Sequence, residues 1–228
     1  YLRELGSNSA DFMCCYMPVL FRGIRFENGN PIIRDSYGIE RGVGGLYLDT
    51  ISYTCETIED VKNYRFPNLS SPVCYASIRL YRLANPDAAV FTWIPGVQDW
   101  SQSIMKMENL YMWLVEYPLV MEQYFRKMAE HTLEIIRGSM SAGATVVVIG
   151  DDYGTQNSML MSKKMWERFI FPCLKMQCGK IHQRGGIAML HSCGHVTPLL
   201  DRFVDAGVDI LHPFQQSAGN DLAAAKAE

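Results

Sequence analysis

The chain has 228 residues, of which 48% are hydrophobic and 20% are charged, and its formal net charge is −3. This composition provides enough apolar side chains for a buried core, and it lacks the basic surplus typical of proteins that bind nucleic acid. The longest apolar stretches have the length of strands, so we expect no membrane-spanning segment and no membrane partner.

The amino-terminal third contains one short apolar stretch followed by turn-rich sequence. Residues 10–15 predict a strand, and a turn signal at Asn28-Gly29 opens a hairpin- and loop-rich insertion over residues 27–72. Alternating apolar residues at 46–53 predict one strand of a hairpin in this insertion. Thr57 stands where the N-cap of a short helix is expected.

From residue 88 onward the sequence predicts regular elements. Residues 89–94 form a β-type run that ends at Pro95-Gly96, and helices follow. Pro118 suits the first turn of a helix. That helix has an apolar face at helical spacing, formed by Met121, Phe125, Met128, Ile135 and Ile136. We predict that this face belongs to the core and is not a cofactor site.

One pattern then occurs three times: a helix that ends in glycine, an apolar strand, and a polar cluster. The predicted strands are residues 146–149, 187–190 and 208–211. Strands that alternate with helices pair in parallel, and near-continuous apolar strands are buried on both faces. A barrel and a doubly wound sheet share this rhythm, but no GxGxxG motif follows any strand. The pattern therefore favours a barrel with its active site at the carboxyl ends of the strands.

His191 and Cys193 lie two residues apart at the end of a predicted strand. Side chains at i and i+2 project from one face of a strand, and imidazole and thiolate are both ligands of zinc. The pair is therefore a candidate metal site for zinc. The alternative is a buried cysteine beside a hydrogen-bonded histidine, without metal. We expect His131 and His182 on helix surfaces and His195 at a helix entry.

Asp151 and Asp152 close the preceding predicted strand. One of two neighbouring carboxylates can have a raised pKa and act as an acid or base, but such residues also cap segments or bind cationic groups. Gln156 belongs to the same polar run, and His212 follows the next strand at the level of His191. We take Asp151, Asp152, Gln156 and His212 as candidate catalytic residues. An earlier strand is followed by further candidates, namely Trp93, Gln98 and Asp99.

The seven cysteines form no CxxC pair and show no spacing of a small secreted protein. We therefore expect a reduced, cytoplasmic protein in which the cysteines other than Cys193 are buried thiols. The chain begins at Tyr1 without a signal peptide and ends inside a predicted helix at residues 221–228. From this we expect a piece of a longer protein.

Several motifs, in order, resemble the uroporphyrinogen decarboxylase superfamily over essentially the whole chain. They are Asp35-Ser36-Tyr37-Gly38, the segment 57–67, Gly150-Asp151-Asp152-Tyr153-Gly154-Thr155-Gln156, Met165-Trp166, Pro172, His191-Ser192-Cys193-Gly194 and Ala206-Gly207-Val208-Asp209-Ile210-Leu211-His212-Pro213. The resemblance implies an α/β protein with the fold of a (β/α)8 TIM barrel. It implies as well that residues 1–228 belong to a single domain. It also implies a partial barrel, incomplete at both ends, with about five of the eight strands and without the C-terminal ones.

The superfamily has two main branches, and the resemblance implies different chemistry for each. True decarboxylases remove acetate carboxyl groups from a porphyrinogen and centre on an Asp at the end of the first strand, where this chain has Met13-Cys14-Cys15-Tyr16. Corrinoid-linked methyltransferases carry His-x-Cys as zinc ligands. His191 and Cys193 match that motif, and a third ligand would fall beyond residue 228.

The resemblance therefore implies a zinc-dependent methyltransferase that moves a methyl group between a corrinoid protein and a thiol. Its partners would be a small-molecule substrate and the corrinoid protein, with no nucleic acid. Two alternatives remain open. One is a uroporphyrinogen decarboxylase, and the other is a non-catalytic barrel that binds a tetrapyrrole or a corrinoid.

Overall fold

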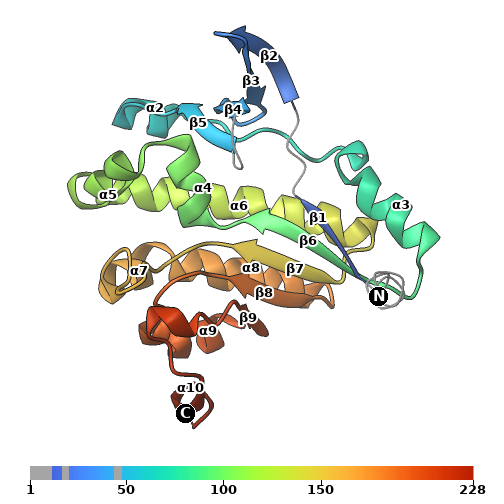
Figure 1. The fold of residues 1–228 in the computed structure, drawn as a ribbon, viewed down its shortest axis with the longest axis vertical. Helices are drawn as coiled ribbons and strands as arrows, with labels where there is room; N and C mark the ends of the chain where they lie inside the picture. The colour runs from blue at the N-terminus through green and yellow to red at the C-terminus, as the bar shows by residue number, and fades with distance from the viewer. Residues whose placement is uncertain (1–11, 17–20, 44–47, 228) are drawn as a thin grey trace.

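The computed structural model describes residues 12–16, 21–43 and 48–227, and these contain two separate sheets (Figure 1). The larger sheet has five parallel strands in the order β1-β6-β7-β8-β9. They are β1 (Phe12–Tyr16), β6 (Ala89–Pro95), β7 (Val146–Gly150), β8 (Ile187–His191) and β9 (Ile210–His212). All five strands that the sequence predicts for this sheet are present.

The arrangement of this sheet distinguishes between the two architectures that share the β/α rhythm. Strands β6 to β9 lie side by side in chain order, without the reversal that defines a doubly wound sheet. The long helices α6 (Pro118–Ala142) and α8 (Phe171–Gln183) pack on each other, and each packs on a strand. Figure 1 shows both helices behind the same face of the sheet. One helical layer over strands in sequential order is the winding of a (β/α)8 barrel.

Shorter helices lie between and after the strands, and several of them pack on α6 or α8. They are α2 (Ile58–Asn63), α3 (Ala76–Ala84), α4 (Val97–Ile104), α5 (Met107–Glu116), α7 (Lys163–Phe169), α9 (Leu200–Ala206) and α10 (Leu222–Ala227), with the short 3₁₀ helices η1 (Pro72–Tyr75), η2 (Thr197–Leu199) and η3 (Gln216–Ala218). The predicted caps are confirmed. Thr57 and Asp60 form a reciprocal capping box at α2, and Pro118 opens α6. Gly207 ends α9 with φ 88°, a left-handed conformation that suits glycine.

The smaller sheet is antiparallel and comes from residues 21–52. Its strands, in the order β2-β3-β4-β5, are β2 (Phe21–Glu27), β3 (Asn30–Asp35), β4 (Glu40–Val43) and β5 (Leu48–Ser52). The predicted strand at 46–53 is β5. The Asn28-Gly29 turn joins β2 to β3 with positive φ at both residues, 50° and 81°, as a tight hairpin requires.

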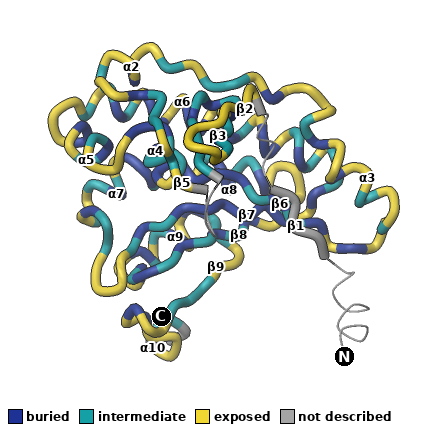
Figure 2. The backbone as a smooth tube through the Cα atoms, turned by 45° about the horizontal axis from the view of Figure 1, so that its top comes forward, coloured by how far each residue is buried: buried dark blue, intermediate teal, exposed yellow. Residues whose placement is uncertain are grey.

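The core lies between the parallel sheet and the helical layer, and Figure 2 shows buried residues all along β7 and at alternating positions of β6 and β8. The predicted apolar face of α6 is confirmed, because all five of its residues are at most 1% exposed. His131 on the same helix corrects an expectation: it is half-buried, not a surface residue. Its Nε2 lies 2.8 Å from the Tyr37 hydroxyl, and its ring stacks on Phe66 with centroids 5.1 Å apart. Tyr37, in the turn between β3 and β4, and Phe66, in the segment after α2, cover this side of α6. No pattern within α6 itself could indicate these partners.

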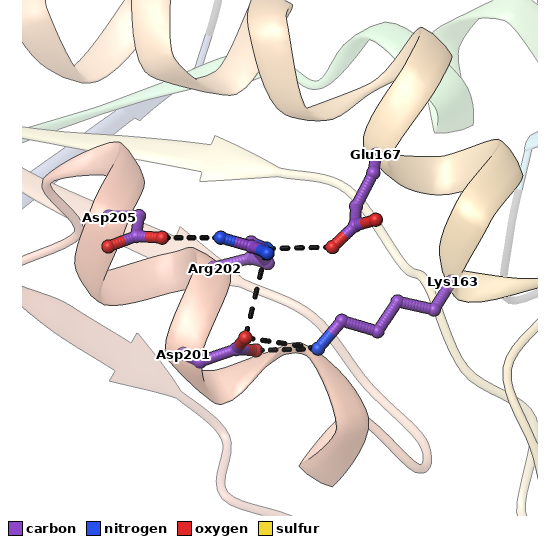
Figure 3. Close-up of polar contacts among 5 residues, drawn as sticks. All are labelled: Lys163, Glu167, Asp201, Arg202 and Asp205. Carbon is purple, nitrogen blue, oxygen red and sulfur yellow. Dashed lines mark hydrogen bonds and ion pairs between the residues drawn. The ribbon is translucent and has the colours of Figure 1, made fainter.

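An ion-pair network joins α7 to α9 on the surface (Figure 3). Arg202 bridges Glu167 and Asp205 at 2.7 Å each, and Lys163 contacts Asp201 at 2.9 Å. Exposed ion pairs of this kind stabilise a protein only weakly. The packing of the buried Trp166 ring on the Phe203 ring contributes more to holding the two helices together. No helix among the described residues is long and apolar enough to cross a membrane.

Candidate metal centre

The polar clusters that follow β7, β8 and β9 meet at one edge of the parallel sheet. The register places Gly150 opposite His191, and His191 opposite His212. The backbone N–H of Asp151 donates to the carbonyl oxygen of His191, and that of Ser192 donates to the carbonyl oxygen of His212, both at 2.9 Å. The ladder therefore continues past the strand ends, and it aligns residues from three parts of the chain.

Asp152, His191 and Cys193 form a compact group at this edge. One ligand atom from each lies within 4.8 Å of the others. Cys193 Sγ is 3.5 Å from His191 Nε2, and Asp152 Oδ1 is 3.9 Å from the same nitrogen. Asp152 Oδ1 also accepts a hydrogen bond from the backbone N–H of Cys193 at 2.7 Å. His191 and Cys193 face each other, as their spacing predicts, and the Asp152 carboxylate lies beside them.

The spacing of this group suits a zinc ion. Bonds of about 2.3 Å to sulfur and about 2.0 Å to nitrogen, at a tetrahedral angle, place the two ligand atoms about 3.5 Å apart. His191 Nε2 and Cys193 Sγ already have that separation. Asp152 Oδ1 lies farther away, at 3.9 Å, so its carboxylate would have to move slightly inward to bind the same ion. The residues present therefore fit zinc with two ligands in place and a third within reach.

The surroundings favour the uncharged forms of His191 and Cys193. Partial burial lowers the pKa of His191, against an opposing effect of the Asp152 carboxylate. Burial and the same carboxylate raise the pKa of the Cys193 thiol. A neutral imidazole is ready to bind a metal, whereas the thiol must first lose its proton.

Asp151 does not belong to this group, although the sequence pairs it with Asp152. Its side chain is 2% exposed and turns toward the start of α4. There its two oxygens accept from the backbone N–H groups of Asp99 at 2.6 Å and Gln98 at 3.3 Å. Burial, followed by the Asp99 carboxylate, raises the pKa of Asp151 to about 8. Of the three roles that the sequence left open, the geometry matches capping, here of a helix that precedes the strand.

His212 and Trp93 flank the ring of His191. His212 Nδ1 lies 3.0 Å from His191 Nδ1, with ring centroids 5.1 Å apart. Trp93, from β6, packs its ring against His191 with centroids 4.9 Å apart. Gln156 lies elsewhere: it is exposed, and its Oε1 accepts from Gln215 Nε2 at 3.3 Å. The structure thus brings His212 to the metal group and leaves Gln156 outside it.

Comparison with known families identifies this chain. The family model described as Uroporphyrinogen decarboxylase (URO-D) matches residues 44–226, most of the sequence. The chain belongs to the URO-D family. No curated protein matches the chain. The parallel sheet and its helices are therefore part of the (β/α)8 TIM barrel of the URO-D family.

A solved structure is similar to this URO-D family chain. It is a methyltransferase from Methanosarcina mazei, with a TM-score of 0.66 and 21% sequence identity. The similarity covers 77% of this chain and 52% of the other, so this chain spans about half the length of that methyltransferase. At this identity the likeness supports the shared fold.

Two residues that the sequence analysis missed hold the loop after Cys193. Asn220 is 4% exposed, and its Oδ1 accepts from the backbone N–H groups of Val196 and Thr197 at 3.0 and 3.1 Å. Gln215 Oε1 accepts from the N–H of Gly194 at 2.8 Å. A Gly-Asn-Asp turn after β9 is the only local signal for Asn220. That signal does not indicate which loop the Asn220 side chain binds.

Glycine is required where this loop meets the one after β7. Gly194 has φ 81°, a conformation that suits glycine, and a β carbon there would lie 2.3 Å from the carbonyl oxygen of Gly154. The backbone N–H of His195 donates to the carbonyl oxygen of Thr155 at 2.8 Å. In this URO-D family chain the backbones of the two loops are therefore in direct contact and joined by a hydrogen bond. This contact fixes the position of Asp152 relative to Cys193.

Proposed function

We propose that this URO-D family protein is a zinc-dependent methyltransferase that moves a methyl group between a corrinoid protein and a thiol. The observation that carries the proposal is the 3.5 Å separation of Cys193 Sγ and His191 Nε2, with the Asp152 carboxylate beside them. Imidazole and thiolate are ligands of catalytic zinc, which takes three protein ligands and keeps one position for substrate. The similarity of the fold to that of a methyltransferase also supports this proposal.

Each residue has a distinct part in this function. His191 and Cys193 hold the ion, and Asp152 fixes the backbone at Cys193 and brings a negative charge to the site. Zinc bound there would lower the pKa of a small thiol, so that the thiol reacts as its thiolate. In the transfer, a sulfur–carbon bond forms and the cobalt–carbon bond of the methylcorrinoid breaks. The electron pair of that bond stays on cobalt, and the thiol proton passes to solvent.

Decarboxylation of a porphyrinogen is the competing function, because the matching family model carries that description. The first strand, β1, has the sequence Phe-Met-Cys-Cys-Tyr and contains no carboxylate. Among the described residues, the carboxylates that follow β6 and β7 at this edge include Asp99, Asp151 and Asp152. The backbone N–H groups of α4 donate to Asp151. A metal-free protein that acts on uroporphyrinogen would satisfy this alternative.

Metal content and methyl transfer together test the proposal. The purified protein should hold one zinc per chain and transfer methyl from methylcobalamin to 2-mercaptoethanol. His191→Ala should lose both the zinc and the transfer. Equal zinc in the two proteins, or none in the wild type, would contradict the proposal. Turnover of uroporphyrinogen by the wild type would then establish the decarboxylase, and its absence would favour a non-catalytic tetrapyrrole-binding barrel.

A further inference from the structure

His212 contacts the metal-site histidine from the neighbouring strand. Its Nδ1 lies 3.0 Å from Nδ1 of His191. The parallel register aligns the two residues, and the backbone N–H of Ser192 donates to the carbonyl oxygen of His212. Residues aligned in this way on adjacent parallel strands project their side chains from the same face of the sheet. The strand pairing therefore places the two imidazoles side by side on one face of the sheet.

The two nitrogens of the His191 ring face different partners. Nε2 faces Cys193 Sγ and the Asp152 carboxylate, and Nδ1 faces His212. A neutral imidazole carries one proton, and only the nitrogen without a proton can bind a metal. For Nε2 to bind a metal beside the thiol, the proton of His191 has to be on Nδ1. The hydrogen bond then runs from His191 Nδ1–H to His212 Nδ1, and the proton of His212 is on its Nε2.

We propose that His212 is a positioning residue that holds His191 as its Nδ1–H tautomer and aims Nε2 at the zinc. This inference rests on the proposed function, since it requires a metal at Nε2. His212 is not a ligand in this arrangement, because its Nδ1 is bound to the ring nitrogen that faces away from Cys193. The Trp93 ring, 4.9 Å from His191, restricts the imidazole from another side. Acceptors that orient a metal-bound histidine typically contribute about 10- to 100-fold to metal affinity.

Zinc affinity of matched variants provides the first test. His212→Ala removes the acceptor, and we expect zinc affinity, measured by competition with a chelating dye, to fall about 10- to 100-fold. His212→Asn places an amide oxygen near the former Nδ1 and should restore affinity to within about 3-fold of wild type, on the same scale. His182→Ala is the control, because His182 is an exposed histidine paired with Asp209 through Nε2, away from the metal centre. It should bind zinc like the wild type.

The tautomer of His191 in the metal-free protein provides a second readout that simple structural damage would not reproduce. Nitrogen-15 NMR should show the proton of His191 on Nδ1 in the wild type and in His212→Asn, and a loss of that preference in His212→Ala. Wild-type zinc affinity in His212→Ala, or a wild-type His191 protonated on Nε2, would overturn the inference. If the wild type binds no zinc, the proposed function fails, and the tautomer still decides the role of His212.

Discussion

Gly150 lies directly against the indole of Trp93. A β carbon at residue 150 would come within 2.4 Å of Trp93 Nε1. The Trp93 ring in turn packs on His191. The last residue of β7 therefore has to be glycine for the tryptophan to occupy its place beside the metal-site histidine.

We expect Gly150→Ala to destabilise the fold and to weaken zinc binding. The added methyl group must displace Trp93, and overpacking of this kind costs about 1–3 kcal/mol. Gly179→Ala is the matched control, because Gly179 lies within α8 and a β carbon there meets nothing within 4 Å. It should stabilise the protein by about 0.5–1 kcal/mol through helix propensity. Urea unfolding measures both, and equal stability of the two variants would contradict the packing argument.

Cys193→Ala should abolish zinc retention while leaving the fold nearly intact. Cys193 is half-buried at the sheet edge and outside the main core, so we expect the free energy of unfolding to change by about 1 kcal/mol or less. Cys74→Ala is the control, since Cys74 on η1 is half-buried like Cys193, and not buried as the sequence led us to expect. Metal analysis and thermal unfolding should show full zinc in Cys74→Ala and none in Cys193→Ala. Zinc retained by Cys193→Ala would exclude its thiolate as a ligand.

Asp151 should matter for stability through α4. Asp151→Ala leaves the N–H groups of Gln98 and Asp99 without their acceptor, and we expect a loss of about 1–3 kcal/mol. Asp151→Asn keeps one acceptor oxygen and should lose less. Urea unfolding gives the two values. If Asp151→Ala unfolds like the wild type but loses methyl transfer, Asp151 acts in the chemistry and not as a cap.

His131 should make the protein sensitive to acid. Burial lowers the pKa of His131 to about 4 from an ordinary value of 6.5, against a small opposing effect of Glu134. The unfolded chain therefore binds a proton at this residue between these pH values, and the folded protein does not. Stability should fall as the pH drops from about 6.5 to about 4.

His131→Gln tests this dependence directly. The amide removes the titration and can still hydrogen-bond the Tyr37 hydroxyl, which lies 2.8 Å from His131 Nε2. We expect the urea midpoint of the variant to decline less than that of the wild type over this pH range. Identical declines would assign the acid sensitivity to other groups.

The sequence predicted much of the fold and part of the metal centre. Apolar runs and glycine stops located the parallel strands to within two residues at most of their ends, because both features act over a few neighbouring residues. The spacing of His191 and Cys193 predicted that their side chains share a face, and the contact at 3.5 Å confirms it. Their assignment as zinc ligands remains a prediction.

Only the tertiary structure decided what depends on packing between distant segments. It separated Asp151, which caps α4, from Asp152, which meets Cys193 across 41 residues of sequence. It also brought His212 to His191 and buried His131 beneath Tyr37. Local periodicity determines the direction of a side chain within its own strand or helix. The partner that it meets there is determined by loops and strand register, which no local pattern contains.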